Sequence, residues 1–513
     1  MFARLAQRAI WGALVGALWA QNDLDAERWS QMNPQGSARA LGMAGAFSAL
    51  GGDPANLTQN PGGLGLFVRG GLWLSPALAL PTTSTTYLSS GHDSRTQLSV
   101  PQFALVLHGR GGKAIPYWNF AFGYNQEGFF HQNSQASGFN ERNSFTQSLA
   151  EQAEGIPDTL LGGTAALAYQ NYFDLGAPLG TRGVIDATNT NPYQYQGVFS
   201  QGQVFQEITS QERGRLNTWS IGAGFSYQNK VYFGAALLIR SLSYSKTYRL
   251  REIDTQNRYN GSGGTTPADE VTFREKYTST GSGVGLALGV LVEPVDFFRF
   301  GLSFTTGSRL RIQDEYNADL EFALDDGRRN STTYAEPFQY TYRFSYPYRV
   351  SVGMAFLLGG KGAVSIEGDF LDYRNATFSS SDYSYDRENE AIEKQFSTAY
   401  NVRAGVEWLL TDQVSLRGGY AYYAPVRNPD GRLYYTDYRQ PANLTSLAMQ
   451  RQFITLGAGY RLDKFFVDVA YLYAMSAQKY LPYTLRNPAY APAPVVVIQN
   501  RTHFIVTTLG LRF

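Results

Sequence analysis

The feature that most constrains this chain is an alternation with a period of two residues, which runs along most of the sequence after Gly70. A β-strand places successive side chains on opposite faces, so this alternation predicts strands with one apolar face. In the longest run, every even position from Phe338 to Phe356 is apolar or aromatic, while the odd positions carry mainly small, polar or charged residues. A soluble antiparallel sheet can alternate in the same way, so the conclusion depends on how often the pattern recurs.

The pattern recurs in several other segments, and their opposite face is rich in Gly, Ser and Ala. The clearest examples are residues 219–227, 284–292, 298–304 and 400–408. In a membrane barrel the apolar face contacts lipid and small or polar residues line the lumen, whereas the polar face of a soluble sandwich is rarely so rich in Gly and Ser. A content of 14% aromatic and 17% charged residues, with 53 Gly, suits the membrane arrangement.

The spacing of the alternating segments predicts the topology. We expect about fourteen strands, near residues 71–90, 97–109, 116–128, 215–228, 231–252, 271–292, 297–317, 336–357, 362–378, 397–410, 413–424, 449–462, 465–480 and 501–513. Short connections such as 228–230, 411–412 and 463–464 alternate with long ones near 129–214, 253–270, 318–335, 379–396, 425–448 and 481–500. Outer-membrane barrels have short periplasmic turns and long external loops. The sequence therefore predicts an all-β fold, a transmembrane antiparallel β-barrel over residues 70–513, with a large extracellular loop at 129–214.

The two ends of the chain indicate export to a bacterial outer membrane. Residues 1–20 combine basic Arg4 and Arg8 with a short apolar stretch, which is typical of a cleaved signal peptide and too short to span a bilayer. No later run of about twenty apolar residues predicts a spanning helix. The terminal Phe513 is in register with Leu511 and Leu509, and it resembles the signal by which the barrel-assembly machinery recognises its clients.

Residues 21–69 do not alternate. They contain many small residues, tight Gly turns and a few large apolar side chains, which predicts short helices in close packing. A barrel of about fourteen strands encloses a lumen that stays open unless something fills it. We therefore expect this segment to form an N-terminal hatch, or plug, inside the lumen; a periplasmic tail is the alternative, and it would be more polar.

The stretch from Ala38 to Leu64 resembles the hatch of the FadL-type long-chain fatty acid transporters. That family carries a small-residue Gly-Ala segment followed by Asp and by an Asn-Pro-Ala element, to which Asp53, Asn60 and Pro61 correspond here. Gly62 replaces the Ala of the family. The fourteen strands, the hatch and the terminal Phe extend the resemblance over nearly the whole architecture.

The resemblance implies passive uptake of hydrophobic compounds, with long-chain fatty acids as the leading case. In the family, ligand is captured by external loops, passes to a pocket in the barrel and leaves through an opening in the wall, and a hatch movement connects these states. Two loop helices are expected, at Ser144–Gly155 and Thr164–Tyr172, and they either gather ligand or simply fold the loop.

Cations in the lumen phase are candidate contacts for a ligand carboxylate. They are Arg240, Arg299, Arg343, Arg349, Arg403, Arg417 and Arg461. Four carboxylates share that phase, Glu367, Asp369, Glu407 and Asp468. Simple pairing between these acids and the arginines is the alternative, because charges inside a membrane protein commonly pair with one another.

Other chemistry is poorly represented. The chain has no cysteine and four histidines, none of them in a metal-ligand spacing, and Gly281, Gly283 and Gly285 precede no helix that would make them a phosphate loop. The sequence predicts no enzyme, no cofactor and no metal site. A net charge of +1 gives no reason to expect nucleic acid. The expected partners are outer-membrane lipids and a hydrophobic small molecule, and the chain is expected to be a monomer.

Two other functions remain open at this point. Some fourteen-stranded relatives, of the PorV type, serve protein secretion as scaffolds or shuttles, and they would bind a large protein partner. A general aqueous porin is the other alternative, although a plug makes no sense for it.

Overall fold

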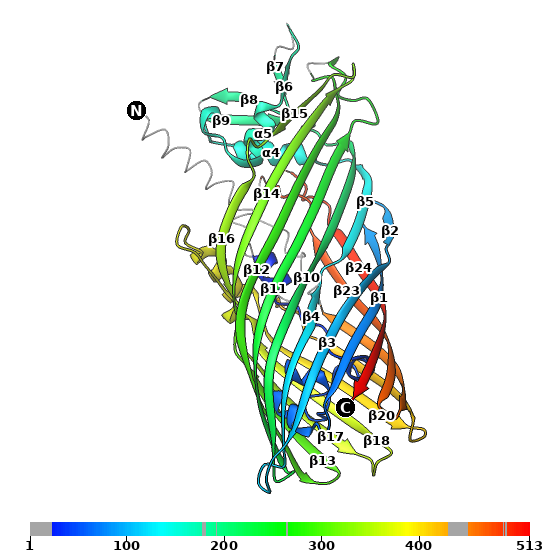
Figure 1. Ribbon diagram of the computed structural model, residues 1–513. Helices are drawn as coiled ribbons and strands as arrows, with labels where there is room; N and C mark the ends of the chain where they lie inside the picture. Colours follow the sequence, from blue (N-terminus) through cyan, green and yellow to red (C-terminus); the bar gives the residue numbers. More distant parts are fainter. Residues whose placement is uncertain are drawn as a thin grey trace.

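The computed structural model describes residues 23–176, 181–190, 192–262, 265–428, 450–485, 487 and 490–513, and within them the chain forms one closed barrel (Figure 1). The signal peptide predicted at residues 1–20 lies outside the described residues. Fourteen antiparallel strands form the wall. The barrel closes between β1 (Gly71–Thr86) and β24 (Val496–Arg512), which pair from Gly71↔Arg512 to Thr86↔Val497. The backbone N–H of the terminal Phe513 donates to the carbonyl of Gly70 at 3.1 Å.

The alternating segments of the sequence form the strands that cross the wall. Between β1 and β24 they are β3 (Gln97–Arg110), β4 (Tyr117–Phe129), β10 (Val204–Tyr227), β11 (Val231–Ile253), β12 (Ala268–Val295), β13 (Phe298–Thr305) with β14 (Arg309–Leu324), β16 (Phe338–Ser345) with β17 (Arg349–Leu357), β18 (Gly362–Asp372) with β19 (Thr377–Ser379), β20 (Thr398–Leu409), β21 (Val414–Tyr423), β22 (Arg451–Leu462) and β23 (Phe465–Tyr480).

Shorter elements stand at the external end of the barrel. They are β2 (Ser90–Ser94), β5 (Gln132–Asn140), β15 (Arg329–Thr333), the hairpins β6 (Tyr172–Asp174) with β7 (Thr181–Gly183) and β8 (Ile185–Thr190) with β9 (Tyr193–Gly197), and the helices α4 (Phe145–Ala153), η3 (Asp158–Leu160), α5 (Gly163–Gln170), η5 (Tyr373–Asn375) and α6 (Asp386–Gln395). Among the described residues, no helix is both long and apolar enough to cross a bilayer.

The wall has two levels of opposite polarity, and β11 illustrates both. In its first half Phe233, Leu237 and Ile239 are exposed on the outer face, as lipid contact requires. In its second half the outer face carries Ser243, Thr247 and Arg249, while the inner face carries buried tyrosines and leucines. The apolar belt is therefore the membrane-spanning part, and the strands continue beyond it as an external extension with a dry interior.

Two neighbouring strands reverse their phase where they leave the belt, which corrects the predicted strands 297–317 and 336–357. The even residues of β17 are exposed, whereas those at the end of β16, Tyr342 and Phe344, are buried inside. The change falls at residues 346–348, where Pro347 has no N–H for the ladder. The adjacent strand is interrupted between β13 and β14, where a Cβ on Gly307 would lie 2.2 Å from the carbonyl oxygen of Tyr346.

The phase reversal makes one sequence prediction wrong. The alternation from 338 to 356 predicts that Arg343 faces the lumen, because its odd positions carry the small and polar residues of an inner face. In the structure it lies on β16, beyond the break, and its side chain is exposed on the outer face. Periodicity alone could not show this, since the kink shifts the register without interrupting the alternation of residue types.

The predicted loop 129–214 is shorter than expected because both flanking strands extend into it. β5 pairs with the first half of β10, from Val204↔Asn140 to Glu212↔Gln132. The two predicted loop helices are confirmed as α4 and α5, and Ser144 caps the first by accepting from the backbone N–H of Gln147.

The external end is filled by a large apolar and aromatic core. It contains side chains from α4, α5 and α6, from the upper strands and from Trp29, which makes edge-to-face contacts with Phe130 and Tyr244 at ring-centre distances of 5.7 and 5.1 Å. This core holds the loops together. The external end therefore has an apolar interior and a polar outer surface, as a water-soluble domain has.

A buried carboxyl group fastens α4 to this core. Glu252, on the external part of β11, accepts from the backbone N–H groups of Phe145 and Thr146 at 2.7 and 3.4 Å and from the Gln206 amide at 2.6 Å. Burial raises the pKa of Glu252 to about 7, although these donors favour the charged form.

We predict that the α4 loop loosens as the pH rises. Folding raises the pKa of Glu252 from its usual value of 4.5 to about 7. The protonated form is the one that the fold stabilises, so about 3 kcal/mol of stability is lost as the pH rises from 4.5 to 7. Limited proteolysis of the 145–200 loop should be several-fold faster at pH 8 than at pH 6, after correction for protease activity.

Glu252→Gln should remove this difference, because the amide has no charge to bury. Glu141→Gln, at an exposed position of the same loop, serves as the control. An equal pH dependence in wild type and Glu252→Gln would contradict the assignment.

Candidate ligand cavity beside the hatch

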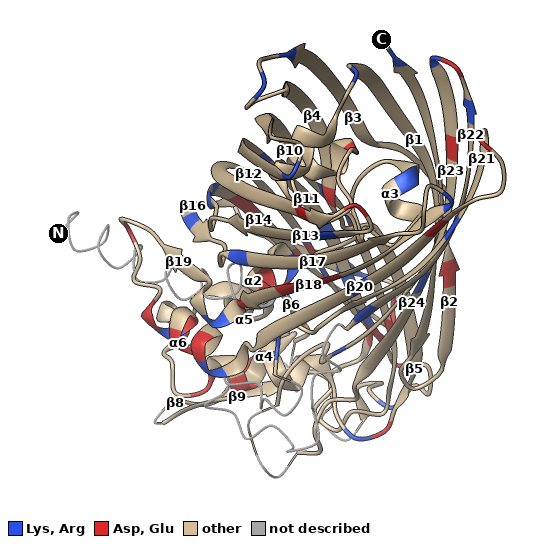
Figure 2. Ribbon diagram, turned by 90° about the horizontal axis from the view of Figure 1, so that it is seen from below, with Lys and Arg blue, Asp and Glu red and all other residues tan. Residues whose placement is uncertain are grey.

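The segment before the first strand lies inside the barrel. It contains α2 (Asp23–Trp29), α3 (Ala38–Gly42), η1 (Pro54–Leu57) and η2 (Pro61–Leu66). Figure 2 shows α3 within the ring of strands, and most of the side chains between residues 34 and 65 are buried. We call residues 23–67 the hatch segment.

The residues carried over from the family motif shape the turns of the hatch segment. Asp53 caps η1: its carboxylate accepts from the backbone N–H of Ala55 at 3.0 Å and from the Ser37 hydroxyl at 2.6 Å. Asn60 caps η2 by accepting from the backbone N–H of Gly62 at 3.0 Å, and Pro61 is the first residue of that helix. The side-chain amide of Asn60 also donates to the carbonyl of Ser48 at 2.7 Å. These residues are therefore structural caps rather than ligand groups.

Wall glycines allow the hatch segment to approach the strands at backbone distance. A Cβ on Gly234 would lie 2.0 Å from the carbonyl oxygen of Pro61, and one on Gly289 would lie 1.9 Å from the side-chain oxygen of Asn60. Such distances are impossible for real atoms, so a side chain at either position would displace η2. Close packing of the hatch segment therefore requires glycine at these positions of the inner face. This requirement accounts for part of the Gly-rich face of the alternating segments.

Ion pairs join the hatch segment to the opposite side of the wall. Arg39 of α3 donates to both oxygens of Glu407, at 3.0 and 2.6 Å. Arg417 donates to Glu407 at 2.8 Å and to Asp468 at 2.6 Å, so one carboxylate bridges two arginines. A buried acid that loses such a partner is strongly destabilising, and this network therefore keeps α3 in place.

Most of the arginines that the sequence proposed as ligand contacts serve these structural roles. Arg240 pairs with Glu127; Arg299 pairs with Glu293 and donates to the carbonyl of Leu50; Arg349 donates to the carbonyl of Thr58; Arg403 pairs with Glu367 and Asp369; and Arg417 pairs as described. Arg461 is partly buried and has no ion-pair partner among the described residues. None of the seven lines the cavity described next. The alternative that the lumen acids pair with arginines is confirmed for all four acids.

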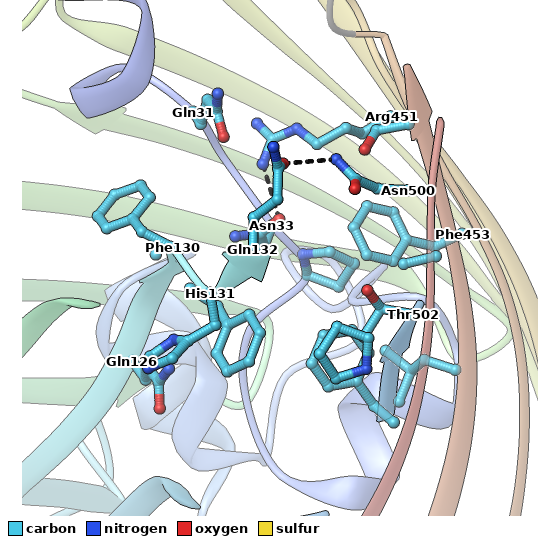
Figure 3. A pocket seen from close by; sticks show the side chains of 18 of the residues that line it. Gln31, Asn33, Gln126, Phe130, His131, Gln132, Arg451, Phe453, Asn500 and Thr502 are labelled. Atoms are coloured by element: carbon cyan, nitrogen blue, oxygen red, sulfur yellow. Dashed lines mark hydrogen bonds between the residues drawn. The ribbon is translucent and has the colours of Figure 1, made fainter. Parts of the chain in front are cut away.

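A cavity of about 200 Å³ lies between the hatch segment and the wall (Figure 3). The hatch segment contributes Gln31, Asn33, Pro34 and Leu41, and the wall contributes residues of β1, β3, β4, β22, β23 and β24. One side is polar, with Gln132 accepting from the Asn500 amide at 2.7 Å. The other side is apolar and is formed by Phe453, Leu472, Phe504 and Val506. The cavity is thus amphipathic.

Arg451 is the polar group that distinguishes this cavity. Its guanidinium donates to the side-chain oxygen of Asn33 at 2.8 Å, and its Nε is buried without a partner. The other cavity arginine, Arg28, has Asp25 and Glu212 within ion-pair distance. No carboxylate among the described residues pairs with Arg451. A cation that is partly removed from water and has no counter-ion is unfavourable, and a carboxylate or other anion in the cavity would stabilise it.

The wall is open where the cavity meets it. β3 and β4 pair from Arg110↔Tyr117 to Gln102↔Asn125 and no further, although both strands continue. Pro101 is adjacent to Gln102, the β3 residue of the last pair, and it lacks the backbone N–H that would continue the ladder. Ser99 and Pro101 on one strand, and Gln126 and Gly128 on the other, line the cavity. We call the space between these residues the β3–β4 gap. Higher up, the wall is joined again by the contact between the side chains of Gln97 and His131, at 2.8 Å, and by the backbone hydrogen bond from Ser89 to Ser137, at 2.9 Å.

A filled barrel with an amphipathic cavity at a break in its wall defines an outer-membrane channel for hydrophobic compounds. A family model for outer membrane protein transport proteins (OMPP1/FadL/TodX) matches residues 215–484, just over half of the chain. The chain belongs to this family, which is a family of transport channels of the outer membrane.

Solved structures show the same fold. A FadL homologue of Pseudomonas aeruginosa is 11% identical, with a TM-score of 0.57 over 94% of this chain and 99% of that one. The toluene transporter TodX of P. putida is 11% identical, with a TM-score of 0.51 over 93% and 98%. At this identity the likeness shows the fold alone. No curated protein sequence gave a significant match.

Sequence reasoning missed Arg451. Its position lies within the expected strand 449–462 and in the same phase as Arg461, so periodicity alone could have placed it in the lumen. Nothing in the sequence shows that acids or carbonyl groups engage most of the other lumen arginines, whereas Arg451 faces the cavity with only an amide partner among the described residues.

We predict that Gly289→Ala and Gly234→Ala displace η2 and loosen the hatch. The added methyl groups would overlap hatch atoms, which should lower the stability of the barrel by about 1–3 kcal/mol and raise ion conductance in planar bilayers. Gly368→Ala is the matched control, because its Cβ would have 3.8 Å to the nearest atom. If all three variants conduct and unfold alike, close packing of the hatch is not what the wall glycines provide.

Proposed function

We propose that this channel carries amphiphiles with an apolar chain and a carboxylate head, with long-chain fatty acids as the leading case. The observation that carries the proposal is Arg451, a partly buried arginine that lines the cavity, has a buried Nε without a hydrogen-bond partner and forms no ion pair with a carboxylate among the described residues. A fatty acid supplies both parts of the complement: a carboxylate for Arg451 and an alkyl chain for the apolar side of the cavity.

The size of the cavity indicates where the rest of the ligand goes. At about 200 Å³ it is smaller than the roughly 300–1,000 Å³ of pockets that enclose drug-sized ligands. It therefore holds the head and the first carbons of a long chain. The remaining carbons need the β3–β4 gap, or space released by the hatch segment.

Lateral exit is supported by the position of this gap. Its lower border lies beside the apolar belt, where Leu98 of β3 is 79% exposed and Val100 points the same way. A chain leaving the cavity here would pass directly from protein into lipid without crossing water, which is the lowest-cost path for an alkyl group.

Hatch movement is supported by the arrangement of its contacts. Leu41 and Asn33 belong to the hatch segment and also line the cavity, so a shift of α3 would enlarge the cavity and change the environment of Arg451. The Arg39–Glu407 pair would oppose such a shift.

We predict that Arg451→Met selectively weakens binding of carboxylates. Loss of a charged hydrogen bond corresponds to about 1.5–3 kcal/mol, or about ten- to a hundredfold in affinity for oleate. Affinity for oleyl alcohol, which has the same chain without the charge, should change little. Binding to the purified protein can be followed by competition with a fluorescent fatty acid.

Arg461→Met is the matched control, because Arg461 is on the inner face of the same strand but does not line the cavity. An equal loss of oleate binding in both variants, or an equal loss of oleate and oleyl alcohol in Arg451→Met, would contradict the proposed carboxylate site. A secretion scaffold or an aqueous porin predicts no difference between the variants.

We predict that closing the β3–β4 gap stops uptake. The chain has no natural cysteine, so Ser99→Cys with Gln126→Cys can be joined across the gap by a short bis-maleimide. Cross-linked cells should take up labelled oleate several-fold more slowly, while binding to purified protein persists.

The control pair is Leu107→Cys with Phe120→Cys, which are exposed direct partners in the closed part of the same ladder. Normal uptake after cross-linking at the gap would show that ligand leaves by another route.

A further inference from the structure

Three arginines lie together on the outer surface of the wall, directly beyond the apolar belt. Arg311 of β14 is the direct cross-strand partner of Arg343 of β16, and Arg309 lies two residues before Arg311 on the same face of β14. All three side chains are exposed. We call them the rim arginines.

The direct cross-strand partners of the rim arginines include several hydroxyl side chains and, among the described residues, no carboxylate. The cross-strand partners are Ser282 for Arg311, Ser345 and Val284 for Arg309, and Ser379 for Arg343. Among the described residues, no acid forms an ion pair with any of the three. Like charges that face each other across two strands destabilise a sheet, and an anion bound between them would relieve this repulsion.

The same wall shows how arginines are neutralised elsewhere. Further from the belt, Arg274 of β12 lies on the same outer face and donates to Asp319 and Glu321 of the adjacent β14, each at 2.8 Å. Acids are thus placed beside arginines on these strands where the surface faces water. No such ion pair is formed by the described residues of the row next to the lipid.

The level of the cluster in the membrane is defined by its neighbours. Val284, the partner of Arg309, is 59% exposed and begins the apolar outer face of β12, which continues through Leu286 and Leu288. The cluster is on the side of the belt that carries the long loops, whereas the C-terminus lies at the opposite end (Figure 1). It therefore faces the headgroups of the outer leaflet.

We propose that the rim arginines bind the phosphate of a phosphorylated lipid in the outer leaflet. A guanidinium donates two parallel hydrogen bonds to a phosphate, and two facing arginines can hold one phosphate between them while the third approaches a second. The acyl chains of the same lipid would lie along Val284 and Leu286. The site is on the outside of the wall, and it is independent of the cavity and of transport.

The proposal is tested with the full-length protein in neutral detergent by native mass spectrometry. The probes are lipid A with two phosphates, with one phosphate and with none. Wild type should bind the diphosphorylated form most tightly and the form without phosphate weakly. Arg309→Gln with Arg311→Gln and Arg343→Gln should lower the affinity for diphosphorylated lipid A about tenfold or more.

The control removes three other exposed arginines of the external end, through Arg249→Gln, Arg258→Gln and Arg328→Gln. It changes the net charge equally and should retain wild-type affinity. Equal loss in the control, or wild-type affinity in the rim variant, would overturn the proposal.

Thermal unfolding gives a second readout that a general loss of stability would not imitate. Without lipid A, the rim variant should unfold at the same temperature as wild type or higher, because repulsion between the arginines is gone. With diphosphorylated lipid A, wild type should be stabilised and the variant should not. Equal stabilisation of both proteins would also overturn the proposal.

Discussion

Backbone-to-backbone packing of the hatch segment against the wall is the constraint on which the rest of this structure depends. A barrel of this size must either remain open or be filled, and it is filled by short helices that touch the strands without side chains between them. Gly234 and Gly289 make that approach possible at η2, where Pro61 and Asn60 fit against them. Because the hatch is fixed at this close distance, the remaining free volume is displaced to the other side of the lumen, where the cavity and the β3–β4 gap are found.

The charged groups of the lumen also fix the hatch segment to the wall. Arginines around the hatch are compensated by acids or by carbonyl groups, and these pairs hold two parts of the chain together. Glu407 is the clearest example, because it links α3 to the wall while it also receives Arg417. Arg451 differs in having only an amide partner. A partly buried arginine that lines a cavity and forms no ion pair marks a place where an anionic ligand can neutralise it.

In the external extension, a strand whose outer face contacts lipid at one level contacts water at the next. Below the rim, the outer face is apolar and the inner face small; beyond it, the outer face is polar and the inner face aromatic. On β11 this change is achieved by a change of residue types in a constant register, whereas on β16 and β17 it is achieved by a kink at Pro347. The rim between the two levels is also where unpaired arginines collect, since a headgroup layer offers anions that neither lipid tails nor bulk water provide at high density.

The sequence by itself indicated the barrel, its strands and the short and long connections, because these follow from local periodicity and turn chemistry. Composition favoured a hatch over residues 21–69 against a periplasmic tail, and Asp53, Asn60 and Pro61 were indicated by a family resemblance rather than by their capping role. The sequence did not determine which charges remain unpaired, since that depends on distances between residues far apart in the chain, such as Arg39 with Glu407 or Arg451 with Asn33. It also placed Arg343 on the wrong face, because a three-residue kink reverses the phase without a signal in the alternation. The cavity, the break between β3 and β4 and the rim arginines were decided only by tertiary structure, as they are properties of neighbouring strands and of the space that the hatch leaves.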